Sequence, residues 1–129
     1  MRRTFQCSIS IALAACALLL LVAGCASVPQ VDSRVTVTPD AQSWVRVIDV
    51  VDGTANDGAP TADVVIESTS SRVRHLRWRI TWSDDGHPYK SILAEWQKFT
   101  LHPYDSRVLS QTAPNANMDD FTVVIDRVP

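Results

Sequence analysis

Cysteine is scarce in this chain and is confined to its start, where it occurs as Cys7, Cys16 and Cys25. Residues 26–129 contain none, so this longer part has no disulfide, no thiolate for a metal and no cysteine nucleophile. Glycine is also rare, with 4 residues, and no glycine-rich phosphate-binding loop occurs. The folded part must therefore be held together by its hydrophobic core.

The chain also lacks an excess of basic charge. The chain has 12 Lys and Arg against 14 Asp and Glu, and loss of Arg2 and Arg3 with a leader leaves 10 against 14, a net charge of −4. Nucleic acids and anionic lipid surfaces are bound by clustered basic charge. We therefore expect no nucleic-acid partner and no electrostatic docking on lipid.

The N-terminus has the three parts of a secretory signal. Arg2 and Arg3 precede an uncharged apolar run over residues 9–23, and the small residues before Cys25 form a processing site of the bacterial lipoprotein type. An uncleaved membrane anchor is the alternative, but a comfortable span needs about 20 apolar residues. The paired arginines also hint at twin-arginine export, although the strongly apolar run favours general secretion. We predict a cleaved signal peptide over residues 1–24.

Residues 25–43 are predicted to form the lipidated N-terminus and a flexible tether. The stretch is polar and is broken by Pro29 and Pro39. Residues 35–38, Val-Thr-Val-Thr, could instead pair as a short edge strand. One acyl chain gives only marginal membrane binding and a second makes it stable, so a covalent lipid on Cys25 would anchor the protein; we expect no other cofactor.

Residues 44–129 are predicted to form one all-β domain. The clearest strand covers residues 74–83, where Leu76, Trp78, Ile80 and Trp82 alternate with polar residues. A tight reversal follows over residues 83–86. Further strands are expected at residues 44–51, 62–68, 96–101, 107–112 and 121–128. About seven short strands with turns between them are typical of an antiparallel, immunoglobulin-like β-sandwich.

No group of residues predicts catalysis or metal binding. His75, His87 and His102 lack the spacing that presents two imidazoles to one metal. The paired aspartates at residues 84–85 and 119–120 lack the alternation and closing glutamate of a calcium loop. No Gly-x-Ser-x-Gly nucleophile motif occurs. We predict that the protein is not an enzyme and that it holds no metal.

One surface is predicted to make contacts. Arg77 and Arg79 share the polar face of their strand with His75, in the densest basic stretch of the chain. Together with Trp44 and Trp96, they are candidates for docking an acidic partner or a glycan. The alternative is a solvated sheet face whose charges discourage edge pairing, with both tryptophans in the core.

Roughly the last two thirds of the domain contain LRWRITWSDDGHPY at residues 76–89, Glu95-Trp96, and LSQTAPN at residues 109–115. Together these features resemble the YcfL-like family of periplasmic lipoproteins. In that family an aromatic-x-apolar-x-Trp strand leads into an Asp-x-x-Gly turn, and an Ala-Pro step follows the penultimate strand. Ser83 departs from the pattern, which often has an aromatic residue there. The resemblance implies a compact β-sandwich and an envelope location, and no catalytic residue.

These observations predict a lipid-anchored envelope protein with a non-catalytic interaction or structural role. Its partners would be the membrane, through the lipid, and another envelope protein. By the sorting rule of enteric bacteria, Ala26 and Ser27 after the lipidated cysteine favour the periplasmic face of the outer membrane over the inner membrane. The alternatives are a small-ligand or glycan-binding protein, and an accessory lipoprotein of a secretion or appendage machine.

Overall fold

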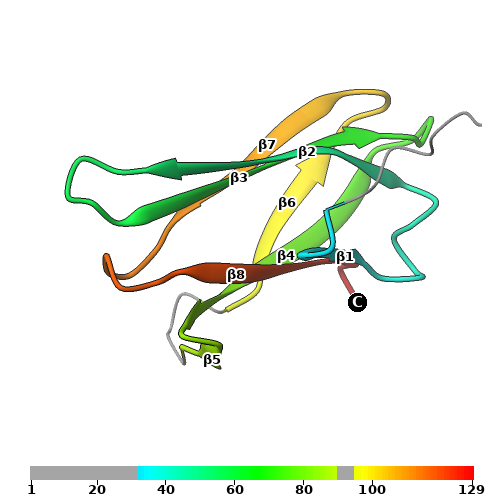
Figure 1. Ribbon diagram of the computed structural model, residues 1–129. Helices are drawn as coiled ribbons and strands as arrows, with labels where there is room; N and C mark the ends of the chain where they lie inside the picture. Colours follow the sequence, from blue (N-terminus) through cyan, green and yellow to red (C-terminus); the bar gives the residue numbers. More distant parts are fainter. Residues whose placement is uncertain (1–31, 90–94) are drawn as a thin grey trace, which may run out of the picture. The chain divides into compact units, whose positions relative to one another are not determined.

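The computed structural model describes residues 32–89 and 95–129, which are all-β. Eight strands occur there: β1 (Val35–Val37), β2 (Val45–Thr54), β3 (Pro60–Ser68), β4 (Arg74–Asp84), β5 (His87–Pro88), β6 (Gln97–Leu101), β7 (Ser106–Thr112) and β8 (Asp120–Arg127). They form two facing sheets (Figure 1). The predicted β-sandwich is confirmed. These residues include no helix able to cross a bilayer. The predicted signal peptide and Cys25 lie outside them.

The two sheets, named sheet A and sheet B, differ in size and composition. Sheet A has the order β1-β8-β4, with β6 on the other side of β4 and β5 folded back as a hairpin at the end of β4. Sheet B has the order β2-β3-β7. All pairs are antiparallel except β1 with β8, which is parallel. The two outer faces of the sandwich are thus built on three or four neighbouring strands each.

The core lies between the sheets and follows the alternation predicted for β4. Leu76, Trp78, Ile80 and Trp82 are all buried, at most 4% exposed. Opposite Trp82 on β8 lies Phe121, with the ring centroids 5.2 Å apart and the planes tilted by 58°. A tilted pair of this kind stabilises the fold by about 0.5–1.5 kcal/mol beyond the contribution of the buried area. The even-numbered residues of β4 therefore face the core and the odd-numbered ones face outward.

The tight reversal predicted after β4 is also present. Asp85 and Gly86 have φ values of 47° and 75°, so both central residues of the turn are left-handed. Two such residues form the turn whose twist matches that of a hairpin. Gly86 adopts this conformation without a Cβ penalty, and β5 pairs back on β4 through Ser83 and Asp84.

The structure differs from the sequence-based expectation at the end of the predicted tether. Residues 35–37 form strand β1, the short edge strand that was the alternative to a tether at this position. Val35 pairs with Val123 and is only 7% exposed, and Ala41 is fully buried. β1 is stabilised by pairing with β8, which lies far along the chain, so its own short sequence is only a weak indication of a strand. Residues 25–31 of the predicted tether lie outside the described part.

Candidate functional site

The outer face of sheet A carries three of the four residues predicted for the contact surface. β6 and β8 flank β4, and their side chains opposite the odd-numbered residues of β4 share that face. Arg77 lies between Lys98 and Asp126, while Arg79 lies beside Val124. The outer face of sheet A is defined here by His75, Arg77, Arg79, Trp96, Lys98, Thr122, Val124 and Asp126.

Trp96 lies against the two arginines of β4. The guanidinium carbons of Arg77 and Arg79 lie 4.3 and 4.6 Å from the centroid of its ring. The register explains this contact, because Gln97 pairs with Trp78 and Trp96 precedes it, next to Arg79. A cation over an indole face gains about 0.5–1 kcal/mol when exposed. The stacking therefore fixes both guanidinium groups in position over the sheet.

Arg77 is neutralised within the protein. Its guanidinium donates to the Asp126 carboxylate from Nη2 at 2.7 Å and from Nε at 3.1 Å. The same carboxylate accepts a hydrogen bond from the Thr38 hydroxyl at 2.7 Å. The Thr38 hydrogen bond, followed by those from Arg77, lowers the pKa of Asp126 below its ordinary value. Asp126 thus remains charged and fixes Arg77 on the sheet.

Arg79 and Lys98 are not neutralised in the same way. Both side chains are exposed. Among residues 32–89 and 95–129, the ion pairs involve Arg34, Arg46 and Arg77, and neither Arg79 nor Lys98 takes part in one. Three cations on this face are therefore balanced by one carboxylate. Arg79 combines a fixed position with an unpaired charge, which is the arrangement that suits an anionic partner group.

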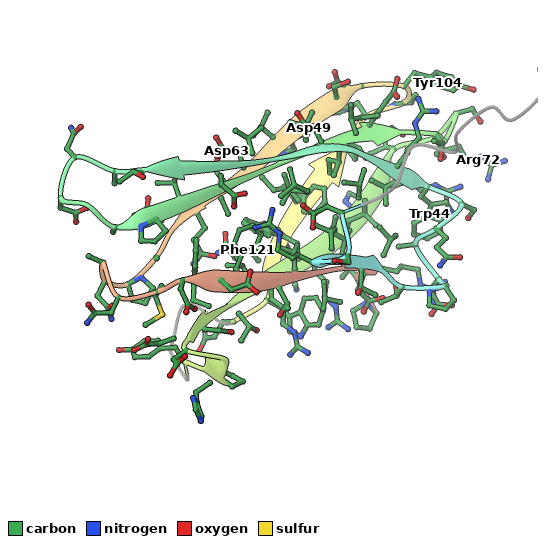
Figure 2. The ribbon with its side chains drawn as sticks, viewed as in Figure 1. Trp44, Asp49, Asp63, Arg72, Tyr104 and Phe121 are labelled. Carbon is green, nitrogen blue, oxygen red and sulfur yellow. The ribbon has the colours of Figure 1, made fainter. Side chains whose placement is uncertain are left out.

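Trp44, the fourth predicted residue, belongs to a different cluster. Its ring lies under the guanidinium carbon of Arg74 at 4.2 Å and near that of Arg127 at 6.0 Å. Arg74 has the parity of the core-facing residues of β4, and Arg127 pairs with buried Leu76. Trp44 is half-buried and packs against the hydrophobic core (Figure 2). The structure thus joins Trp96 to Arg77 and Arg79, and places Trp44 at the core margin.

The outer face of sheet B is a charged surface that the sequence reading did not single out. It is defined here by Arg46, Asp49, Val51, Asp63, Val65, Glu67 and Val108, with Ile48 as the extra residue of a β-bulge. Asp49 and Asp63 belong to neighbouring strands (Figure 2). Arg46 pairs with Glu67. Three carboxylates on this face are balanced by one cation, the opposite of sheet A.

The histidines and aspartates do not assemble a metal site in the described part of the chain. His75 lines a shallow hollow of about 250 Å³ with Lys98 and Phe99, and its Nδ1 lies 3.2 Å from the Thr100 hydroxyl. The residues lining that hollow include no carboxylate. No group of three or more His, Cys, Asp or Glu in residues 32–89 and 95–129 could hold a metal.

One residue of each aspartate pair, Asp85 and Asp119, links the two segments to which the pairs belong. The Asp119 carboxylate accepts a hydrogen bond from the Asp85 amide at 3.1 Å, and the Asp119 amide donates to the Ser83 carbonyl at 3.0 Å. The segment before β8 is thereby held to the β4–β5 hairpin. All four aspartates are exposed.

A separate hollow of about 420 Å³ lies between the edge strands β1 and β2. It is lined by Val35, Val37, Gln42, Val45, Arg46, Val47 and Thr69. None of the four residues predicted for the contact surface lines it. The hollow and the outer face of sheet A are therefore independent features.

The comparisons with known proteins place the chain in a family. The model described as "Protein of unknown function (DUF1425)" matches residues 32–127, and the chain belongs to this family. No curated protein matches it. The family description names no activity, so nothing in it points to an enzyme.

Two solved structures share the fold. Campylobacter jejuni cj0090 has a TM-score of 0.63 at 18% identity, over 75% of this chain and 100% of its own. A DUF1425 family member from Shewanella sp. pv-4 has a TM-score of 0.59 at 23% identity, over 66% and 79%.

Proposed function

We propose that this member of the DUF1425 family is a lipid-anchored envelope protein that acts, without catalysis, as a periplasmic interaction module. Its contact surface is the outer face of sheet A, and its partner is an envelope protein with an acidic surface. The observation that carries the proposal is Arg79, which is stacked on Trp96 while its charge has no acidic partner among the described residues. The resemblance to YcfL-like lipoproteins is compatible with this family membership and supports the envelope location.

The anchoring part of the proposal rests on the N-terminal sequence. Leu-Val-Ala-Gly-Cys at residues 21–25 closes an apolar run that follows two arginines. Cleavage before Cys25 leaves a cysteine that can carry a thioether lipid and an acylated amine. More than one acyl chain makes such an anchor stable. Ala26 and Ser27 favour the outer membrane under the enteric sorting rule.

The contact part of the proposal rests on how Arg79 is held. Ordering a long side chain at an interface costs about 0.5–1.5 kcal/mol, and stacking on Trp96 reduces this cost in advance. A guanidinium lying on a ring keeps its N–H groups at the edge, where they match the two oxygens of a carboxylate. A partner that presents Asp or Glu beside apolar residues therefore fits the surface formed by Arg79, Trp96 and Val124.

The anchor is tested by labelling cells with radioactive palmitate. We expect label on the wild-type protein and none on Cys25→Ala, which lacks the thiol that is acylated. Immunoprecipitation followed by autoradiography measures this difference. Equal labelling of the two proteins would contradict the lipid anchor and leave the contact surface to be judged separately.

The contact surface is tested by crosslinking in intact cells followed by mass spectrometry. Arg79→Glu reverses the charge on the outer face of sheet A, and Arg72→Glu makes the same change in an exposed loop between β3 and β4. We expect recovery of the crosslinked envelope protein to fall about tenfold for Arg79→Glu, as for a close interfacial charge pair, and to persist for Arg72→Glu. Equal recovery from wild type and both variants would exclude this face.

A further inference from the structure

The outer face of sheet B has the composition of a second docking surface. Val51 and Val108 are 46% and 52% exposed, and Ile48 at the bulge is 50% exposed. Val65 lies directly opposite Val108 and joins these residues into one apolar strip across the three strands. Three of the six exposed large hydrophobic residues of the described chain thus belong to this face. Apolar patches rimmed by polar residues mark interaction sites.

The rim of this strip is acidic. Asp49 lies opposite Val65 on the neighbouring strand, and Asp63 lies opposite Val51. Glu67 is the one carboxylate of the face that forms an ion pair, with Arg46; Asp49 and Asp63 form none within residues 32–89 and 95–129. The partner that fits therefore presents apolar groups between cations.

The outer face of sheet A offers that complement. Its unpaired cations, Arg79 and Lys98, lie beside Trp96 and half-buried Val124. Lys98 pairs with Arg77, which is two residues from Arg79 on β4, so Arg79 and Lys98 lie one strand and two residues apart, about 8 Å. Asp49 and Asp63 lie one strand and two residues apart, which is about 8 Å. The charge spacing and the apolar centre of the two faces therefore correspond.

We propose that the outer face of sheet B binds the outer face of sheet A of a second copy of this chain. The inference rests on the proposed function, because it names the partner of the same Arg79 surface. Different faces meet in such a contact, so one copy keeps a free outer face of sheet A and the other keeps a free outer face of sheet B. The contact is heterologous and repeats into a ring or an open chain of copies, not a closed dimer.

The contact is expected to be weak in solution. Three strands about 4.8 Å apart and seven residues of about 3.3 Å each span roughly 14 by 23 Å. That is smaller than the roughly 800 Å² per partner of a standard stable complex. Confinement of anchored copies to one membrane raises their effective concentration without any new contact. The test therefore uses the full chain in cells.

The experiment places a photo-crosslinking amino acid at Val108 of one tagged copy and co-expresses a second copy with a different tag. We expect an adduct between the two tags. Arg79→Glu in the second copy should reduce the adduct about tenfold, because an attractive pair becomes a repulsive one. Adding Asp63→Lys to the first copy should restore it, which also shows that both variants fold. Arg72→Glu in the second copy is the matched control and should leave the adduct unchanged.

The outcomes separate this inference from the proposed function. No adduct between copies, or an adduct insensitive to Arg79→Glu, overturns self-association. Restoration of the adduct when Arg79→Glu is combined with Asp63→Lys supports self-association, because a different partner protein would not respond to both substitutions in this way. A crosslinker at Thr122, exposed on the outer face of sheet A, gives the second readout. If it captures another envelope protein in an Arg79-dependent way and never a second copy, the proposed contact surface stands and self-association is excluded.

Discussion

On the outer face of sheet A three cations stand against one carboxylate, whereas on sheet B three carboxylates stand against one arginine. Each face contains one ion pair that joins neighbouring strands, Arg77 with Asp126 and Arg46 with Glu67. The side chains of the first pair are 24% and 18% exposed, and those of the second are 64% and 33% exposed. The two faces thus have opposite net charge, and the ion pair of sheet A is the less exposed of the two.

The difference shows how charge is divided between stability and contact. Arg77 is enclosed by Asp126 and Trp96, so its charge is used within the fold. Arg79 and, on the other sheet, Asp63 are left without an ion pair in the described residues. Surface ion pairs contribute little to stability, so charges left unpaired cost little in the free energy of unfolding and remain available to a partner.

The largest expected difference between the faces concerns the two arginines in ion pairs. Arg77→Ala should lower the free energy of unfolding by about 2 kcal/mol, because it leaves half-buried Asp126 without its charged donor and removes the Trp96 stack. Arg46→Ala should lower it by less than about 1 kcal/mol, as expected for an exposed pair. Urea unfolding of both variants measures the difference. Equal losses would contradict the contrast between the faces.

Removal of Trp96 should have a smaller effect on stability and a larger one on contact. Trp96→Leu keeps apolar bulk but abolishes two cation–ring contacts, at a cost of about 1 kcal/mol. Because Arg79 also loses its fixed position, we expect weaker crosslinking to the partner than for a variant at half-buried Trp44. Trp44→Leu is the matched substitution and should alter stability through the core margin. Unchanged crosslinking of Trp96→Leu would show that the stacking of Arg79 on Trp96 is not needed for binding the partner.

Acid should weaken sheet A through Asp126. Its pKa in the folded protein lies below the ordinary value of 3.8, because Thr38 and Arg77 donate hydrogen bonds to the charged form. This stabilisation is complete above the unfolded pKa and is lost as the pH falls through the folded pKa. Urea unfolding from pH 7 to about pH 2 should therefore show a steeper loss below pH 3.8 for wild type than for Asp126→Asn. Parallel profiles would rule out a contribution from this carboxylate.

The smallest expected effect concerns the apolar strip of sheet B. Val108→Thr keeps a β-branched side chain at a position that is 52% exposed, so the free energy of unfolding should change by less than about 0.5 kcal/mol. Leu109→Ala, on the core side of the same strand, should cost about 2–5 kcal/mol. Thermal melting distinguishes the two. A large decrease in the free energy of unfolding for Val108→Thr would indicate that the apolar strip stabilises the domain and is not available to a partner.

Sequence periodicity predicted the centre of the sandwich because the signal there is local. β4 alternates over its whole length, so its core face and its cationic face follow from parity alone. The proximity of Trp96 to Arg77 and Arg79 depends on the register between β6 and β4, which parity does not give. Trp44 precedes β2 of sheet B, and its position beside Arg74 and Arg127 of sheet A depends on the packing of the two sheets, which parity does not give either.

Two further features depend on distant pairing or on an irregular strand. β1 has only three residues, and its partner β8 lies at the other end of the domain. On β2, the bulge at Ile48 interrupts the alternation. Val51 and Val108 therefore looked like ordinary strand residues, and their exposure became visible only in the folded chain.

The parallel pairing of β1 with β8 determines how the domain would carry a pulling force. β1 is reinforced by Arg34, which binds Asp32 and Asp52 and lies 4.4 Å from the Phe121 ring centroid. A pull on the chain before residue 32, resisted by a hold on the outer face of sheet A, draws β1 back along its own axis past β8. The backbone hydrogen bonds between β1 and β8 are then loaded in shear together with the Arg34 ion pairs, and all of them must break at once. Peeling β1 away from β8 would break these interactions one at a time. β1 therefore resists a larger force when it is pulled along its axis than when it is peeled from the sheet.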